Sequence, residues 1–454
     1  MKKINLIIGG GIAGLITAKK LVNQNKKNIV LVEATNHLGG LLKSHHYNHQ
    51  GAYDLGTHYF ANIYGEEIKT ILKSTLNEVE WAIHNGVRSD LSGVFHNGVW
   101  NLDTVFVNLF SYNKRKRDNY KKLIQSHIKQ KSTKDLDPIT SYDYLNNIYG
   151  STITTEIFEP ILEKLSGHRG KNLHPFAAQL YPLNRMVLFN EEEALENLDK
   201  PINQVAAFPS QLDLPNHLHP TYYSYYPKER GIGKVIDALE AELEKSGVQI
   251  LKNTKVNSLK YGNKIETATI TGIKYQIEKV YSTLPIFRLS SLLGINIDYS
   301  SLDSPRHTVL SHLKLTTDFD FNQRHYMYCY DKGFNTFRIT NYNAITLKNE
   351  NPLPLTLESS FKEIPSVKEA NQKIISELIQ LKIIKEESQV KFIHSEILPY
   401  GFPMLTKTNM DYIEKKRNEI KSLKISNLIS LGIFSDNNIF FMRDVLRKIE
   451  NLVK

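Results

Sequence analysis

The first residues in the chain that could do chemistry form a glycine-rich turn. Gly9, Gly11 and Gly14 fit the pattern G-x-G-x-x-G, between an apolar run at residues 4–8 and a helical pattern at residues 15–22. The first glycine of such a turn permits the tight bend, the second leaves room for a pyrophosphate, and the third lets the helix pack on the strand. The helix start, at Ile12 and Ala13, would present backbone N–H groups to phosphates.

An acidic residue ends the next apolar run. Residues 29–32 predict a second buried strand, and Glu33 follows directly, 19 positions after Gly14. A carboxylate there suits the two hydroxyls of an adenosine ribose and would repel a 2′-phosphate, which disfavours NADP. Strand, turn, helix, strand and acid together predict a dinucleotide site; the alternative for the glycines alone is an ordinary glycine-rich turn.

The residues after Glu33 carry a family resemblance. Ala34 is followed by Gly39-Gly40-Leu41 and then by Gly56-Thr57-His58, and this order resembles the FAD-dependent amine oxidase and protoporphyrinogen oxidase superfamily. The resemblance implies FAD, with these residues at its phosphates and ring. Some amine oxidases bind flavin through a cysteine of the carboxyl-terminal segment, where this chain has none, so non-covalent FAD is predicted. Leu41 stands where the family commonly has arginine.

Later segments continue the resemblance in the family's order. A predicted helix at residues 234–245 leads to Val256, whose backbone the family places at the adenine edge, and Thr283-Leu284-Pro285 matches its strand exit. Gly432 follows a last apolar strand, with Ile433 in place of the family's usual arginine, and a helix is predicted to start near Phe441 and Met442. In the family, that helix points its N-terminus at the flavin.

His58 also resembles the Gly-x-His of UDP-galactopyranose mutases, which makes it a candidate catalytic residue; the alternative is a loop histidine with a satisfied hydrogen bond. Three further candidates belong to the substrate side. Arg185 matches the family's arginine after the helical cap. Arg338, between Thr336 and Thr340 on a predicted strand, is either an anion clamp or part of a solvent-facing side. Tyr226 belongs to a tyrosine cluster that either lines a pocket or fills the core.

Three functions remain open. The leading prediction is an FAD-dependent oxidoreductase that removes a hydride from a C–N or C–C unit of a small, phosphorylated or sugar-nucleotide substrate. The second is a flavin-dependent sugar-nucleotide mutase. The third is a degenerate, non-catalytic FAD-binding protein, which Leu41 and Ile433 would favour.

The fold that must position these residues is α/β. A discontinuous Rossmann-type FAD-binding domain (residues 1–85, 221–287 and 395–454) would carry an inserted α+β substrate domain, made of a mixed sheet plus a helical cap. The inserted parts are residues 86–220 and 288–394, and residues 103–220 form the cap, which is expected to be mostly helical.

Composition excludes several other classes. Hydrophobic residues make up 41% and charged residues 23% of the 454, as in ordinary globular proteins. The charge of +10 (57 Lys+Arg minus 47 Asp+Glu) favours an anionic small-molecule substrate, and Lys114–Arg117 is expected to be a surface turn rather than a nucleic-acid site. The single cysteine, Cys329, cannot form an intramolecular disulfide, which favours a location in the reducing cytoplasm. No transmembrane segment and no metal-binding spacing is predicted, and the oligomeric state stays open, a homo-oligomer included.

Overall fold

The computed structural model describes residues 2–130, 137–398, 403–437 and 439–453. The chain divides into two compact units. Unit 1 comprises Met1–Ala82, Ser224–Leu302 and Asp411–Lys454, and unit 2 comprises Ile83–Tyr223 and Asp303–Met410. Within the described part of the chain, no helix is long and apolar enough to cross a bilayer.

Unit 1 is built around a mixed sheet with a parallel half. Its order is β13-β2-β1-β16-β15-β14, and β22 pairs with β16. The strands are β1 (Ile4–Ile8), β2 (Ile29–Val32), β13 (Gln249–Leu251), β14 (Val256–Tyr261), β15 (Ile265–Ile270), β16 (Ile273–Ser282) and β22 (Leu428–Ser430). The helices that belong wholly to this unit are α1 (Ile12–Asn23), α2 (Glu66–Lys73), α9 (Gly233–Lys245), α10 (Ile286–Leu292) and α14 (Met442–Leu452). Smaller strands are β3 (Ser44–Tyr47), β4 (Gly51–Asp54) and β5 (Phe60–Ala61).

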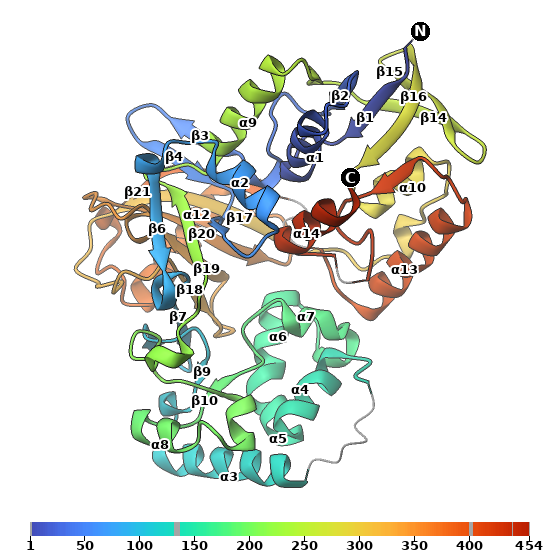
Figure 1. The fold of residues 1–454 in the computed structure, drawn as a ribbon. Helices are drawn as coiled ribbons and strands as arrows, with labels where there is room; N and C mark the ends of the chain where they lie inside the picture. Colours follow the sequence, from blue (N-terminus) through green and yellow to red (C-terminus); the bar gives the residue numbers. More distant parts are fainter. Residues whose placement is uncertain (1, 131–136, 399–402, 438, 454) are drawn as a thin grey trace. The chain divides into compact units, whose positions relative to one another are not determined.

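The parallel half explains the mainly apolar runs of the sequence. β1 pairs in parallel with β2 on one side and with β16 on the other, and every residue of β1 and β2 is buried. Strands covered on both faces read as continuous hydrophobic segments. Helix α1 packs against α9 and α14 beside this sheet (Figure 1). The predicted strands at 4–8 and 29–32, and the helix between them, are confirmed.

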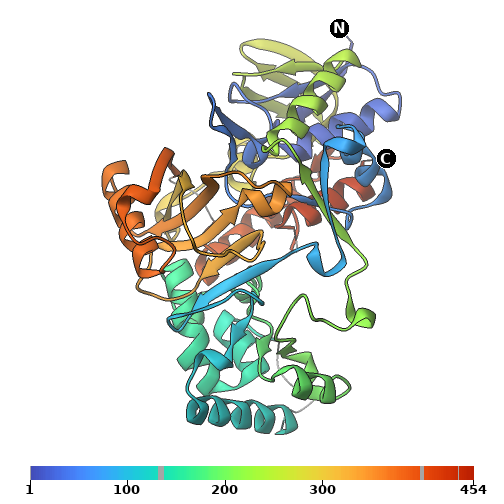
Figure 2. The ribbon, with the colours of Figure 1, turned by 90° about the vertical axis from the view of Figure 1, so that its left-hand side faces the viewer.

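Unit 2 contains a second seven-stranded sheet with the order β21-β17-β20-β19-β18-β7-β8. Its strands are β7 (Ser92–His96), β8 (Val99–Asn101), β17 (His307–Leu315), β18 (Tyr326–Cys329), β19 (Thr336–Asn341), β20 (Leu353–Phe361) and β21 (Val390–Leu398). The pairing of β18 with β7 is parallel and the others are antiparallel. Ile374 and Leu378 of helix α12 (Val367–Gln380) join the core of this sheet. Residues 307–398, which supply five of the strands and this helix, are drawn in the yellow to orange part of the colour range in Figure 2. The turns around Asn97 and Lys332 join β7 to β8 and β18 to β19 as antiparallel hairpins.

The remaining elements of unit 2 lie mainly between residues 103 and 223. They are β9 (Val107–Asn108), α3 (Lys114–Gln130), α4 (Ser141–Tyr149), α5 (Ser151–Ile153), α6 (Glu159–Ser166), α7 (Pro175–Gln179), β10 (Met186–Val187), α8 (Glu191–Glu196), β11 (Ala206–Ala207) and, later in the chain, α11 (Tyr342–Thr346). Strands β6 (Trp81–Asn85) and β12 (Tyr223–Pro227) and helix α13 (Lys407–Ser422) carry the chain across the unit boundaries.

Two predictions about this region need correction. Residues 103–220 are mostly helical only as far as α7. After α7, the one α-helix in this described stretch is the short α8, and short strands and loops make up the rest. Prolines recur in this part of the chain, and proline interrupts helices. The basic run at Lys114 is the first turn of α3 rather than a surface turn. Asn113 explains this helix start, because its side-chain oxygen accepts a hydrogen bond from the backbone N–H of Lys116 at 3.0 Å.

The boundaries of the units differ from those drawn on the sequence, mainly in the second half of the chain. Residues 288–302 lie in unit 1, because Leu289 and Leu293 belong to the core beneath β14 and β15. Residues 395–398 and 403–410 lie in unit 2, because β21 extends to Leu398 along β17. Apolar packing sets the first limit and strand pairing the second, and the sequence displays neither.

Candidate dinucleotide site and substrate pocket

The glycine turn and the Gly39-Gly40 pair meet in unit 1. The N–H of Gly39 donates to the carbonyl of Gly10 at 2.8 Å, and Gly11 and Gly39 form an isolated parallel bridge. Gly39 and Gly40 have φ of +98° and +58°, the left-handed region that favours glycine. Two segments 28 residues apart in the chain (Gly11 to Gly39) therefore form one backbone surface at the start of α1.

The three glycines of the turn have different surroundings. A Cβ at Gly14 would lie 2.0 Å from the carbonyl oxygen of Gly9, and a Cβ at Gly9 would lie 2.3 Å from Oγ1 of Thr283. A Cβ at Gly11 would meet no atom within 4 Å. Packing therefore requires Gly9 and Gly14, whereas Gly11 borders a space that the protein leaves open at the N-terminus of α1. This is the arrangement that a dinucleotide pyrophosphate needs.

Glu33 lies beside this turn. One carboxylate oxygen accepts the N–H of Gly10 at 2.8 Å, and the other accepts the N–H and the hydroxyl of Thr35, both at 2.9 Å. The side chain is half-buried. These bonds hold the carboxylate at the end of β2, where a ribose would have to be recognised.

The chain returns to this corner just before Val256. The N–H of Thr254 donates to the Glu33 carbonyl at 2.9 Å, and the N–H of Asn253 donates to the Thr35 carbonyl at 2.8 Å. Val256 itself is half-buried at the start of β14. The segment predicted to meet the adenine thus lies next to the residue predicted to meet the ribose.

Two more predicted residues lie at the carboxyl ends of β16 and β22. The Thr283 hydroxyl donates to the Ile8 carbonyl at 3.0 Å, and a Cβ at Gly432 would lie 2.2 Å from the Leu284 carbonyl oxygen. Gly432 is therefore required for the close approach of these two chain segments. Helix α14 begins at Met442, with Phe441 as its N-cap, as predicted.

The remaining cofactor candidates lie in exposed or loop positions. Ala34 is exposed and Leu41 is 61% exposed, whereas Gly56 has φ of +107° in the loop after β4. Thr57 and His58 follow in this loop, and Nε2 of His58 lies 3.2 Å from the Leu55 carbonyl oxygen. His58 thus has at least one hydrogen-bond partner within its own loop, and its catalytic role stays a prediction.

Tyr226 has a buried hydrogen-bond network rather than a pocket around it. Its hydroxyl donates to Asp54 at 2.6 Å and accepts the N–H of Gly231 at 2.9 Å. Asp54 also accepts the hydroxyl of Ser44 at 2.6 Å and the N–H of Ile232 at 3.0 Å. Burial raises the pKa of Asp54 to about 6, although these hydrogen bonds and Arg230 lower it. Tyr225 and Tyr226 are fully buried on β12, so both belong to the core.

The two arginines predicted for the substrate side have different surroundings. Arg338 forms a bidentate pair with Glu358 on the neighbouring strand, at 2.5 and 2.7 Å. Burial by itself lowers the pKa of Arg338, but Glu358 and Tyr328 more than offset this and raise it. Thr336 and Thr340 are buried too, so the alternative of a solvent-facing side is wrong. Arg185 donates to the Asn203 carbonyl at 3.1 Å.

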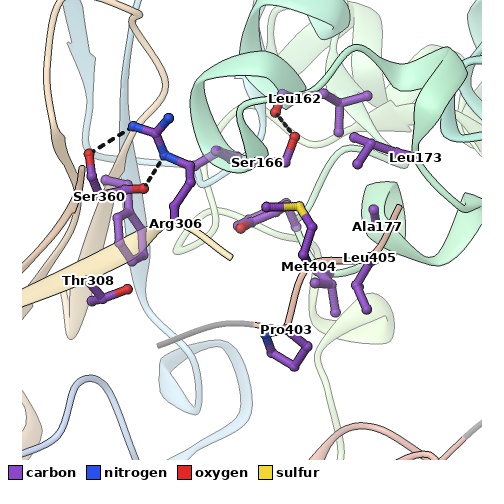
Figure 3. A pocket seen from close by; sticks show the side chains of 14 residues that line it. Leu162, Ser166, Leu173, Ala177, Arg306, Thr308, Ser360, Pro403, Met404 and Leu405 are labelled. Atoms are coloured by element: carbon purple, nitrogen blue, oxygen red, sulfur yellow. Dashed lines mark hydrogen bonds between the residues drawn. The ribbon is translucent and has the colours of Figure 1, made fainter. Parts of the chain in front are cut away.

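An apolar pocket lies wholly within unit 2 (Figure 3). It contains about 600 Å³ of empty space, part of it open to solvent, between helices α6 and α7, strands β17, β19 and β20, and the segment at residues 403–405. Leu162, Phe337 and Met404 contribute to its apolar lining. Its lining is predominantly apolar with a few polar groups, as in small-molecule sites.

Arg306 is the one arginine in this lining. Its guanidinium donates to the Ser360 hydroxyl at 2.6 Å and to the Ser360 carbonyl at 3.1 Å (Figure 3). Burial lowers its pKa, and among the described residues no carboxylate contacts it. Sequence reasoning missed Arg306; the available signal was its place after Pro305, directly before an alternating strand.

Comparison with known proteins supports the fold. Residues 7–75 match the family model described as an NAD(P)-binding Rossmann-like domain. No curated protein sequence matches the chain.

Solved structures with the same fold cover nearly the whole chain. A reduced UDP-galactopyranose mutase is 16% identical over 93% of this chain and 89% of that one, with a TM-score of 0.71. A protein from Exiguobacterium sp. 255-15, provisionally assigned as a protoporphyrinogen oxidase, is 14% identical over 100% and 98%, with a TM-score of 0.67. A putrescine oxidase variant is 14% identical over 99% and 98%, with a TM-score of 0.58.

Proposed function

We propose that this chain, which has the fold of these oxidases and of the mutase, is an FAD-dependent oxidoreductase acting on a small substrate that carries an anionic group. The observation that carries the proposal is the open space at Gly11, bordered by Gly39 and Gly40 and lying beside Glu33. When bound, FAD would supply a hydride acceptor for a C–N or C–C unit of the substrate.

The residues of unit 1 would divide the binding of FAD among them. The N–H groups of Ile12 and Ala13, at the start of α1, face no acidic residue in the helix's first turn and would bind the pyrophosphate. Glu33 would bind the ribose, and the backbone at Val256 the adenine. Gly432, Phe441 and Met442 would lie toward the flavin.

The substrate would bind in the pocket of unit 2. Its apolar lining would contact the uncharged part of the substrate, and Arg306 would bind the anionic group because no carboxylate among the described residues neutralises it. Arg338 is less suited to this role, because Glu358 already occupies its guanidinium. We therefore move the anion-binding assignment from Arg338 to Arg306, and we treat Tyr226 as a residue that positions Asp54.

The first test is spectroscopic. The purified protein, reconstituted with FAD, should show the flavin absorbance bands, and the Gly11→Val variant should lose FAD while it keeps its fold. Gly262→Val is the matched control, because a Cβ there also meets no atom within 4 Å, and it should bind FAD normally. A wild-type chain that stays colourless would contradict the proposal.

The second test separates the reaction classes. An oxidase turns over aerobically and releases hydrogen peroxide with substrate. Turnover that needs prior reduction and consumes no oxidant would replace the oxidoreductase with an isomerase. Bound flavin that resists photoreduction and every substrate would indicate a non-catalytic protein.

A further inference from the structure

Unit 1 contains a cavity whose lining residues could bind an anion, and the proposed flavin site does not use these residues. The cavity contains about 1030 Å³ of empty space, part of it open to solvent, beside strand β22. Residues from α10, α13 and α14 contribute to its lining, and these three helices are labelled in Figure 1. Four of the lining residues are cationic, Arg417, Lys421, Lys424 and Lys448, and one is acidic, Asp436.

Arg417 is the most buried of the four cations. It is only 7% exposed, and among the described residues no hydrogen bond or ion pair involves its side chain. Its guanidinium has little exposed surface and no carboxylate partner among the described residues, so an anionic ligand in the cavity would supply the missing counter-charge.

The neighbouring groups leave a surplus of positive charge. Lys448 donates to the Ser435 hydroxyl at 3.0 Å and lies 3.8 Å from Asp436, which also lies 3.5 Å from Lys421. Burial lowers the pKa of Lys448, and the charges of Lys421 and Arg417 lower it further, whereas Asp436 raises it. In the described part of this cavity, one carboxylate thus serves two lysines and leaves the other cations unpaired.

A hydroxyl in the lining also lacks a partner. Oγ of Ser430, on β22, is buried and has no hydrogen-bond partner among the described residues. Serine can donate to an acceptor oxygen or accept from a donor. Beside it, Ile286, Ile429 and Leu452 give the cavity an apolar wall.

We propose that this cavity binds a phosphate-bearing small molecule, with Arg417 and Lys448 on the phosphate and the uncharged part of the ligand against the apolar wall. Several cations facing one acid suit a doubly charged oxyanion better than a single carboxylate. The site is separate from the glycine turn, so it is available to a second ligand, such as an effector or co-substrate, when FAD is present.

The experiment uses the protein saturated with FAD, so that the dinucleotide site is filled, and titrates inorganic phosphate and phenyl phosphate by calorimetry. Both should bind, and phenyl phosphate should bind more tightly because its ring packs on the apolar wall. Arg417→Met and Lys448→Met should each weaken phenyl phosphate binding at least tenfold, and Ser430→Ala a few-fold.

Lys415→Met is the matched control, because Lys415 is an exposed cation of the same helix that does not line the cavity. It should bind as the wild type does.

If Arg417→Met fails to fold, Lys448→Met and Ser430→Ala carry the test. No binding of either probe, or equal binding by the pocket variants and the control, would overturn the proposal. Phosphate binding as tight as phenyl phosphate binding would overturn the apolar part. A chain that binds phenyl phosphate but no FAD would support this inference and contradict the flavin proposal.

Discussion

Single side chains in this protein show how burial changes the role of a residue that looks reactive in the sequence. Tyr226 and Arg338 both carry groups typical of active sites. In the structure each has a buried partner, Asp54 for the tyrosine and Glu358 for the arginine. Arg306 is bonded to a serine and meets no carboxylate among the described residues, so it keeps its charge for a ligand.

Asp54 should make the stability of the fold depend on pH. Its pKa is about 6 in the folded state, above the ordinary value of 3.8, so between these values the folded state binds more protons than the unfolded state. The free energy of unfolding should therefore fall as pH rises from 4 to 6, by at most about 3 kcal/mol from this group.

Denaturant unfolding at several pH values checks this expectation. Asp54→Asn should be less stable at pH 4, since its amide would face hydrogen-bond donors, and should lack this part of the slope. Asp237→Asn, an exposed control in the same unit, should keep the slope. Parallel profiles for wild type and Asp54→Asn would show that another group titrates.

Arg306 should determine anion binding in the pocket of unit 2. With octanoate as an amphipathic probe, Arg306→Met should weaken binding at least tenfold, because the pocket keeps its apolar wall and loses its cation. Lys362→Met, an exposed cation in the same unit, is the control. Calorimetry gives both affinities, and unchanged binding by Arg306→Met would assign the anion contact elsewhere.

At the scale of elements, one buried ion pair links two central strands of the second sheet. Arg338 on β19 and Glu358 on β20 are directly paired in register. Arg338→Met should cost about 3–5 kcal/mol of stability, because it leaves the Glu358 carboxylate buried and unpaired.

The double variant Arg338→Met with Glu358→Met should recover most of that loss, since both charges are then removed. Chemical denaturation measures the three stabilities. If the single variant is as stable as the wild type but no longer binds octanoate, Arg338 contacts the ligand instead.

The elements that could be predicted are those whose signal is local. Mainly apolar runs on either side of a glycine turn predict β1 and β2, and helical periodicity predicts α1 and α9. The residues around Phe441 and Met442 predict the start of α14. The unit boundaries and the irregular part of the cap depend on packing between distant segments, which leaves no local pattern.

The same difference applies to the site. The glycine turn, Glu33 and Gly432 could be located because backbone geometry demands particular residue types there. The partner of Arg338 and the isolation of Arg306 from carboxylates could not, because both depend on which strands become neighbours in the sheet.

At the scale of the whole molecule, FAD should protect four segments of unit 1 that are far apart in the chain. Hydrogen exchange with and without FAD should slow at residues 9–14, 33–40, 253–256 and 439–442, because ligand binding lowers the rate of local opening. Strand β17 of unit 2 serves as the internal control. Protection limited to unit 2 would contradict the assignment of the cofactor site.

The position of β1 in the middle of the sheet of unit 1 has a consequence for how the protein is made. Ile4 leaves the ribosome early but pairs with Ile277, and β16 in turn waits for Leu428. At ordinary translation speeds this delay is on the order of tens of seconds. Throughout it, the mainly apolar strand β1 of the nascent polypeptide has β2 on one side but lacks β16 on the other, so the yield of native protein should depend on chaperones that shield this strand.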